Sequence, residues 1–176
     1  MKSILSEFEK INKKFDLLTI EEALKLPKEI LRCEVPKGFN GYTVDEKCCW
    51  WLRSPGYDKN AAFVNTNGFI NAYGDNVYNE CAIRPILRID QSLLYSLPRT
   101  KKGYVKCAGI KWIDISSYLG EPCLLKKKCL EKTDQFDEKT NNYEQSKIKA
   151  FLENWFPLQF ETFVIWRRKC RCQEKK

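Results

Sequence analysis

Nine cysteines and the complete lack of histidine limit the chemistry open to this chain of 176 residues. Without an imidazole there is no serine-hydrolase triad, histidine-bound zinc or histidine nuclease. The candidate thiol sites are Cys48 with Cys49, Cys123 with Cys129, and Cys170 with Cys172. None has the C-x-x-C spacing of zinc and redox centres. We expect reduced cysteines, mostly buried as small apolar residues, with no catalytic site, metal or cofactor.

Carboxylates are a second candidate for chemistry, because calcium prefers oxygen ligands. The residues concerned are Asp114, Asp134, Asp137, Glu138 and Asn141. Their spacing matches no calcium-binding loop. We interpret them as a solvated acidic face and as caps for the helix that follows Asn142.

Tyrosine and asparagine recur between residues 57 and 79, and this composition suits recognition. Both residue types provide contact area and hydrogen bonds at low entropic cost. The predicted partner-binding residues are Tyr57, Asp58, Lys59, Asn60, Asn65, Asn67, Asn71, Tyr73, Asp75, Asn76, Tyr78 and Asn79. The alternative is a set of ordinary polar loops.

The net charge of +8 favours anionic partners and makes contact with nucleic acid plausible. Two basic segments could contact phosphates, and the tryptophan beside the second could stack on a base. The residues of this alternative site are Lys126, Lys127, Lys128, Trp166, Arg167, Arg168, Lys169 and Arg171. A solvated, frayed tail is the other interpretation of the second segment.

The elements that must position these residues begin with two helices. Apolar residues at helical spacing in residues 1–15, from Ile4 to Phe15, predict an amphipathic helix. Thr19 and Glu22 form a capping-box pattern, which predicts a short helix from about residue 20 that ends before Pro27.

Short strands follow. Residues 61–66 and 69–73 flank Asn67-Gly68, a dipeptide that accepts positive φ at both positions and predicts a tight hairpin. Residues 74–76 predict a second turn. The apolar run 82–89 contains Pro85, which cannot donate a ladder hydrogen bond and therefore indicates an edge or a bulge.

The second half of the chain begins with a connector at residues 91–103. Residues 104–115 and 123–128 are predicted to be two strands separated by a turn at 120–122. Asn142 can cap a helix whose apolar residues fall at helical spacing. Those residues are Ile148, Phe151, Leu152 and Trp155.

These patterns predict one α+β domain over residues 1–176. Its parts are an N-terminal helix (1–15), a first half (16–90), the connector (91–103), a second half (104–160) and a basic C-terminal segment (161–176). No run of residues has the length and apolar character of a secretory signal or a membrane span. We expect a cytoplasmic protein that does not engage membranes.

The segment CWWLRSPGYDKNAAFVNTNGFINAYGDNVYNECAIRPILRID, residues 49–90, resembles a domain of unknown function found in bacterial and phage-borne proteins. Its pattern is WWLRSPG, then AA-x-V, two glycine-centred turns and VRPAL. The matching residues are Trp50, Trp51, Leu52, Arg53, Ser54, Pro55, Gly56, Ala61, Ala62, Val64, Gly68, Gly74, Val77, Ile83, Arg84, Pro85 and Leu87.

This resemblance implies a C-type-lectin-like fold of mixed, mostly antiparallel short strands with flanking helices. It also implies kinship with formylglycine-generating enzymes and the variable proteins of diversity-generating elements. The second half is similar to the part of that domain that normally comes first, so the chain resembles a circular permutant.

The resulting hypothesis is a non-catalytic protein in the cytoplasm of a bacterial host. Its partner would be a protein or a nucleoprotein complex, bound by the loops between the framework residues. A specific version is a phage or mobile-element inhibitor of a bacterial defence nuclease, of the anti-CRISPR type. The alternatives are a nucleic-acid-binding accessory protein and a cysteine-dependent oxidase of the formylglycine-generating type.

Overall fold

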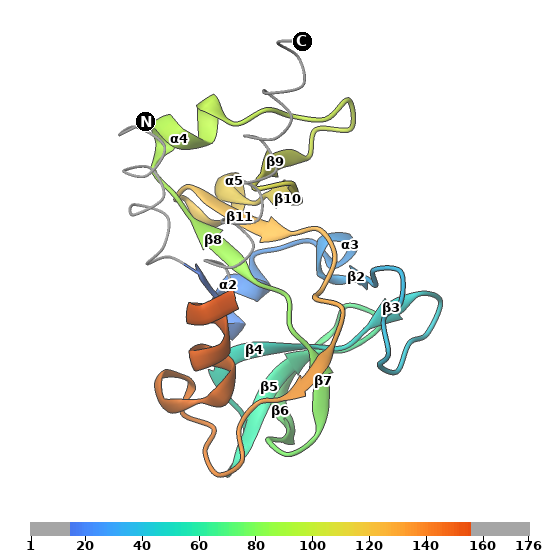
Figure 1. Ribbon diagram of the computed structural model, residues 1–176. Helices are drawn as coiled ribbons and strands as arrows, with labels where there is room; N and C mark the ends of the chain where they lie inside the picture. Colours follow the sequence, from blue (N-terminus) through green and yellow to red (C-terminus); the bar gives the residue numbers. More distant parts are fainter. Residues whose placement is uncertain (1–14, 156–176) are drawn as a thin grey trace.

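The computed structural model describes residues 15–155, which form two five-stranded sheets and one two-stranded sheet (Figure 1). The first sheet has the order β1 (Phe15–Asp16), β8 (Ile86–Arg88), β11 (Cys123–Lys126), β10 (Ile110–Asp114) and β9 (Val105–Cys107). The second has the order β12 (Thr133–Gln135), β7 (Glu80–Ala82), β4 (Trp50–Pro55), β5 (Asn60–Val64) and β6 (Ile70–Asn76). β2 (Cys33–Glu34) pairs with β3 (Lys47–Cys48).

The helices of the described chain are short. They are α2 (Ile20–Leu24), α3 (Lys28–Leu31), α4 (Gln91–Ser96), α5 (Ser116–Leu119), the 3-10 turn η1 (Tyr143–Gln145) and residues 147–155. Pairing between the named strands is antiparallel except between β4 and β7. The predicted α+β class with mostly antiparallel short strands is therefore confirmed. None of these helices combines the length and apolar character that a membrane crossing needs.

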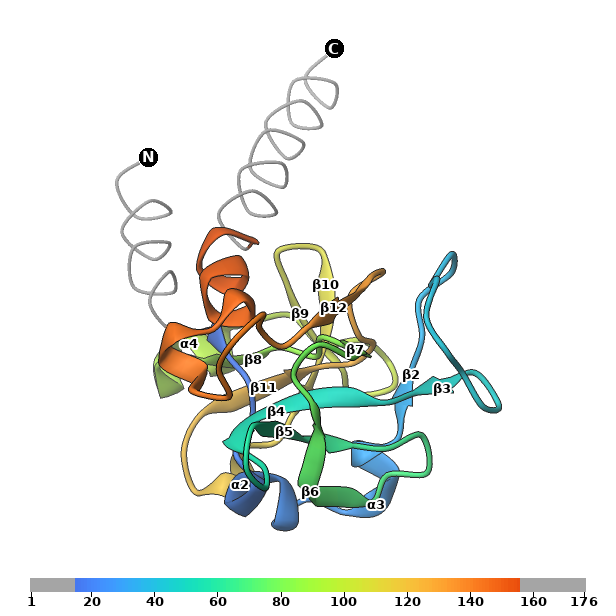
Figure 2. The same cartoon turned by 90° about the horizontal axis from the view of Figure 1, so that it is seen from below.

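Strand β4 is the central strand of the second sheet, and its first three residues are buried on both faces of the sheet. Trp50, Trp51 and Leu52 are each fully buried. Since successive strand residues point to opposite faces, Trp50 and Leu52 join the cluster that includes α2 and α3 residues, whereas Trp51 joins the cluster of Ile148 and Leu152. Figure 2 shows the two groups of helices on opposite sides of β4 and β5.

The capping box is present as predicted and starts α2. The Thr19 hydroxyl accepts a hydrogen bond from the Glu22 N–H (3.1 Å), and the Glu22 carboxylate accepts one from the Thr19 N–H (2.8 Å). The helix ends before Pro27, as expected. Phe15, predicted to end the first helix, is instead part of strand β1, where it pairs with Leu87. The rest of the predicted helix and the basic segment 161–176 lie outside the described residues.

The hairpin β5–β6 confirms the Asn-Gly prediction, but its turn is of a different type. Gly68 has φ +85°, whereas Asn67 is not among the positive-φ residues. The Gly68 N–H donates to Asn65 O (3.0 Å) and the Asn65 N–H to Phe69 O (2.9 Å). This is the three-residue loop in which a type I turn ends on one left-handed glycine.

The predicted second turn at residues 74–76 is instead a bulge inside β6. Ala61 pairs with Asp75 and Phe63 with Asn71, so β6 has extra residues opposite a short step of β5. Gly74 has φ +80°, a conformation that glycine adopts without steric cost. The turn comes later, where the Asn79 N–H donates to Asn76 O (2.9 Å).

Pro85 occupies neither an edge strand nor a bulge. It lies in the link 83–85 by which the chain leaves β7 in one sheet and enters β8 in the other (Figure 1). The link is paired with the returning chain, since Lys126 N–H donates to Pro85 O (2.9 Å) and Leu130 N–H to Ile83 O (2.8 Å). A proline is tolerated here because only its carbonyl is needed.

Two predicted segments contain more structure than expected. The connector 91–103 includes α4, whose Leu94 is buried against the first sheet. Residues 104–115 form a hairpin of β9 and β10, since Ala108 (φ +51°) and Gly109 (φ +76°) make a two-residue turn. Residues 123–126 form β11 as predicted.

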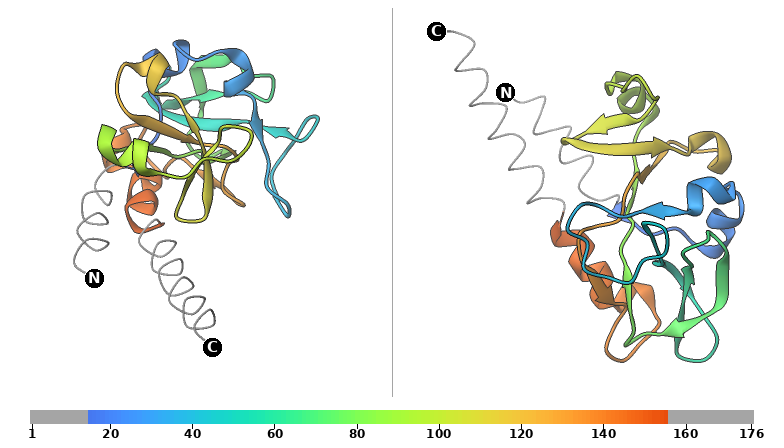
Figure 3. Two further views of the ribbon diagram at one scale, coloured as in Figure 1. Left: turned by 90° about the horizontal axis from the view of Figure 1, so that it is seen from above. Right: turned by 90° about the vertical axis from the view of Figure 1, so that its right-hand side faces the viewer.

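The predicted helix after Asn142 is present as residues 147–155, where the Ser146 hydroxyl accepts a hydrogen bond from the Lys149 N–H (3.1 Å), and the extended backbone of Ser146 separates this helix from the 3-10 turn η1. The Asn142 side chain accepts a hydrogen bond from the Glu144 N–H (3.1 Å). Ile148 and Leu152 are buried, but Phe151 is 38% exposed, so the apolar face is narrower than predicted. The loop between β2 and β3, residues 35–46, projects from the side of the molecule opposite the helix 147–155 (Figure 3).

Candidate functional site

Tyr57, Tyr73 and Tyr78 are the most exposed aromatic residues of the predicted binding set, and we call them the tyrosine surface. Their exposed fractions are 70%, 76% and 54%. The rings of Tyr57 and Tyr73 lie side by side, with centroids 6.2 Å apart. Three large amphipathic side chains therefore face solvent from the loop 56–59, from β6 and from the turn after it.

The asparagines of the same set mostly hold turns together. Asn65 Oδ1 accepts from the N–H groups of Asn67 (3.2 Å) and Phe69 (3.0 Å), and Asn71 Oδ1 accepts from Gly74 (3.1 Å). Such local bonds are a common reason for asparagine in turns. The sequence prediction grouped residues that hold the backbone with residues that are free to contact a partner.

Residues with the same stabilising role are Asn60, Asn67, Asp75 and Asn76, whose side chains each bond to a nearby backbone group. Asp75 also accepts from the Asn79 side chain (2.8 Å). Asp58, which has φ +53°, and Lys59 are exposed.

Gly56 and Asn141, to which the sequence analysis gave other roles, hold the loop that presents Tyr57. A Cβ at Gly56 would lie 2.5 Å from Tyr73 O, so only glycine allows this close approach. The Asn141 side chain donates to Asp58 O (2.8 Å) and Asn60 O (3.0 Å) from the far half of the chain. Phe69, 58% exposed with Lys28 Nζ 3.8 Å from its ring centre, was missed as an exposed aromatic residue.

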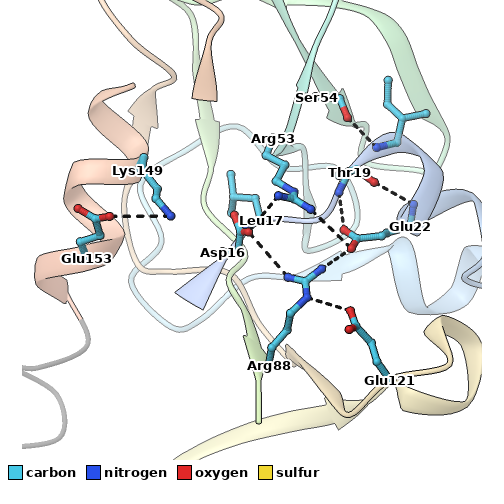
Figure 4. A network of polar contacts seen from close by, with 11 residues as sticks. Asp16, Leu17, Thr19, Glu22, Arg53, Ser54, Arg88, Glu121, Lys149 and Glu153 are labelled. Carbon is cyan, nitrogen blue, oxygen red and sulfur yellow. Dashed lines mark hydrogen bonds and ion pairs between the residues drawn. The ribbon is translucent and has the colours of Figure 1, made fainter. Parts of the chain in front are cut away.

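A network of ion pairs joins the two sheets (Figure 4). Arg53 lies 3.2 Å from Asp16 and 3.7 Å from Glu22. Arg88 pairs with the same two carboxylates and with Glu121 at 2.9 Å. β1, α2, β4 and β8 are thereby tied together, which is a structural role for Arg53.

Two open hollows flank this network. One, of about 290 Å³, is lined by Phe15, Asp16, Arg88, Ile89, Glu121, Pro122 and Lys149. The other, of about 480 Å³, is lined by Thr19, Arg53, Ser54, Pro55, Asn141, Asn142, Tyr143 and Glu144. The first is lined by the paired residues Asp16 and Arg88, and the second by Arg53, which pairs with Asp16 and Glu22.

The predicted basic spot on β11 is engaged in contacts within the protein. Lys126 Nζ donates to Lys128 O (3.0 Å) and Cys129 O (2.9 Å). Lys127 Nζ pairs with Glu34 (3.0 Å), which lowers the pKa of that carboxyl, and Lys128 Nζ donates to Val35 O (2.9 Å). The other residues of the nucleic-acid alternative, Trp166, Arg167, Arg168, Lys169 and Arg171, lie outside the described residues.

The structure splits the cysteine pairs that are neighbours in sequence. Cys48 and Cys49 point to opposite faces of the chain. Cys49 Sγ lies 2.8 Å from Cys81 Sγ, and this contact raises the pKa of the buried Cys81 thiol. Cys123 is buried, and burial raises its pKa to about 12. Cys170 and Cys172 lie outside the described residues.

Cys48 belongs instead to a cluster with Cys33 and Cys129, all three buried. Their Sγ atoms lie within 4.8 Å of one another, with 3.5 Å between Cys48 and Cys129. Burial opposes the thiolate at Cys33, but hydrogen bonds from Cys129 and Cys48 and the charge of Arg84 hold its pKa below the ordinary value. The two sequence separations of this cluster, 15 and 81 residues, match no recognised metal motif.

The acidic residues that could suggest calcium do not converge on one site. Asp114 pairs with Arg99 (2.8 Å), and Asp134 with Lys147 (2.7 Å). Asp137 accepts backbone N–H bonds, which include one from Lys147 (2.9 Å). Within residues 15–155, the cysteine cluster is the one group that brings three possible metal ligands together.

No curated protein and no solved structure matches the chain. A family model described as a domain of unknown function (DUF6273) matches residues 5–91. That segment includes α2, α3 and the strands from β1 to β8. The segment 49–90, for which the sequence indicated a resemblance to a domain of unknown function, lies within the residues that match this family model, and the match does not extend into the second half of the chain.

Proposed function

We propose that the chain is a non-catalytic binding protein that recognises a protein partner, alone or within a nucleoprotein complex, through the tyrosine surface. The observation that carries the proposal is the exposure of Tyr57, Tyr73 and Tyr78 on a backbone held by turn-capping asparagines. Tyrosine is enriched at the energetic centres of protein interfaces.

The local backbone supports this role because it is ordered before a partner arrives. The Tyr57 N–H donates to Tyr73 O (2.8 Å), and the Asn141 amide holds the loop 58–60. A surface that is already ordered loses little conformational entropy on binding. The net charge of +8 favours a partner with an acidic surface.

The finer hypotheses rest on the resemblance of residues 49–90 and on the charge. They are a C-type-lectin-like ancestry, a cytoplasmic site of action in a bacterial host, and inhibition of a defence nuclease. The solvent-facing position of the tyrosine surface, between the framework residues of that segment, supports this reading over an oxidase.

The test compares Tyr73→Ala with Tyr95→Ala, since both side chains are 76% exposed and Tyr95 lies on α4 outside the tyrosine surface. Wild-type protein, immobilised and exposed to lysate of its native host, should retain a partner that Tyr95→Ala also retains. Tyr73→Ala should weaken binding of that purified partner by about 1 kcal/mol or more. Both variants should unfold at the wild-type temperature.

Nuclease treatment and a salt series complete the experiment. Equal binding by wild type and Tyr73→Ala would overturn the proposal. So would a complex that is lost after nuclease treatment, depends on residues 167–176 and weakens steeply with salt, because phosphate contacts release counterions.

A further inference from the structure

Three elements bring three sulfur atoms together inside the protein. Cys33 on β2 and Cys48 on β3 are direct partners in an antiparallel pair, and Cys129 lies in the chain that returns from β11. The exposed fractions of these residues are 0%, 1% and 0%. Metal–thiolate bonds of about 2.3 Å place sulfurs roughly 4 Å apart, and the Sγ atoms here already lie within 4.8 Å of one another.

One buried cation, Arg84, and one half-buried cation, Lys126, lie beside this cluster, and neither has a carboxylate partner among the described residues. The Arg84 guanidinium, 1% exposed, donates only to carbonyls, at 2.9 Å to Lys126 O and 2.7 Å to Ile30 O. Lys126 Nζ donates to two more carbonyls. In the described part of the chain neither makes an ion pair, although other lysines and arginines do. Both are close enough to interact with the cysteine cluster electrostatically.

Charge balance points to an anionic occupant of the cluster. Buried charges are normally paired, because desolvation of an isolated ion is costly. With three neutral thiols, Arg84 and Lys126 would have hydrogen bonds to carbonyls but no ion pair among the described residues. Three thiolates with one monovalent ion have a net charge of −2, and with one divalent ion a net charge of −1. The positive charges of Arg84 and Lys126 would stabilise either complex.

We propose that Cys33, Cys48 and Cys129 form a buried three-thiolate site for one thiophilic closed-shell metal ion, Cu⁺ or Zn²⁺. Each thiol gives its proton to solvent as a metal–sulfur bond forms, and no oxidation takes place. Soft thiolate ligands select these ions. Bound metal would fasten the β2–β3 hairpin to the segment after β11, and so link the DUF6273 segment to the second half of the chain.

The metal experiment uses the full chain with Cys170→Ser and Cys172→Ser, so that these two thiols cannot contribute. The apoprotein is reconstituted with Zn²⁺ or, under anaerobic reduction, with Cu⁺, then desalted and measured by elemental analysis. We expect one equivalent of at least one of the two ions per chain. The addition of Cys48→Ser should abolish retention, whereas Cys107→Ser, a buried cysteine outside the cluster, should not.

A second readout does not depend on a folded variant. Burial already shields Cys33, Cys48 and Cys129 in the apoprotein, so the comparison is made in partly denaturing urea. There, the metal-loaded protein should be alkylated more slowly than the apoprotein at these three cysteines, as located by mass spectrometry. Retention of less than a tenth of an equivalent of both ions would overturn the proposal. Equal retention by Cys48→Ser, or metal-dependent protection confined to cysteines outside the cluster, would overturn it as well.

Discussion

Arg84 shows how a single buried cation is accommodated in this fold. Its guanidinium donates to carbonyls from α3, at Ile30, and from the chain at Lys126 and Lys127, and it lies 5.2 Å from the centre of the Trp50 ring. The sequence indicates that an arginine within an apolar run needs a bidentate partner or several carbonyls. It cannot indicate which carbonyls, because they belong to segments more than 40 residues away.

Replacement of Arg84 by lysine tests whether the planar group is needed. A single ammonium cannot reach all of these carbonyls, so Arg84→Lys should lower the free energy of unfolding by about 3 kcal/mol. Arg32→Lys, on the exposed end of α3, should change it by less than about 0.5 kcal/mol. Urea denaturation measures both, and a loss at Arg84 no larger than at Arg32 would contradict the role assigned here.

The pair Cys49–Cys81 makes a prediction about oxidation. Its sulfurs are 2.8 Å apart, Cys49 is partly exposed, and the hydrogen bond from Cys81 lowers the pKa of Cys49. Thiolate character and access favour disulfide formation. With diamide, which takes up two electrons and two protons, a Cys49–Cys81 disulfide should form first. Peptide mapping without reduction checks this, and Cys107, whose pKa burial raises to about 11, should stay reduced.

At the scale of elements, the sequence predicted where helices and hairpins occur better than it predicted the backbone conformation of individual turns. The capping box, the β5–β6 hairpin and the helix after Asn142 follow from local rules and are present. The prediction of a turn at Gly74 was wrong because a glycine that allows a bulge and one that allows a turn look alike in sequence. The cysteine cluster was missed because three elements that are distant in sequence form it.

Replacement of a left-handed glycine can cost stability in two ways, through the strained positive φ and through a clash of the added Cβ, and Gly74 and Gly103 allow the two to be measured separately. Both have φ near +80°, but a Cβ at Gly74 would lie 2.4 Å from Ala61 O, whereas one at Gly103 would have no atom within 4 Å. Gly103→Ala should therefore cost about 1–2 kcal/mol, and Gly74→Ala about 2 kcal/mol more because backbone must shift. Equal losses in thermal or urea unfolding would show that the close approach to β5 is unimportant.

Asp137 stabilises the start of the helix 147–155. Burial opposes its ionisation, but hydrogen bonds from the N–H groups of Lys139, Lys147 and Thr140 outweigh this and lower its pKa. Asp137→Ala should cost about 1–2 kcal/mol at pH 7. Because the folded pKa is the lower one, the contribution is complete above about pH 5 and is lost as the pH falls through it.

The measurement for Asp137 is urea unfolding of wild type and variant between pH 7 and pH 3. The gap between the two should narrow toward acid. Glu138→Ala, at an exposed neighbour, should leave stability unchanged within about 0.5 kcal/mol. A gap that is constant with pH would show that the charge of Asp137 contributes nothing.

At the scale of the whole molecule, the two halves of the chain share both large sheets. β11 of the second half pairs with β8 of the first, and β12 pairs with β7. The sequence predicted one domain with a shared core, but it could not give this exchange, since strand order depends on contacts between distant residues. The side chains of Trp51, Phe136 and Ile148 meet in one cluster that contains residues from both halves.

The sharing of sheets predicts a single cooperative unfolding transition. Tryptophan fluorescence and far-UV circular dichroism should therefore follow one urea curve, as two-state unfolding requires.

Trypsin should cut first at the exposed Lys101 and Lys102, in the turn where the Gly103 N–H donates to Thr100 O (2.9 Å). The cut halves should stay associated under native conditions, because β11 remains paired with β8 and β12 with β7 across the cut. Residues 104–176 made alone should lack a cooperative transition, since β11 and β12 would lose their partners. A stably folded 104–176 fragment, or two separate unfolding curves, would show instead that each half is an independent domain.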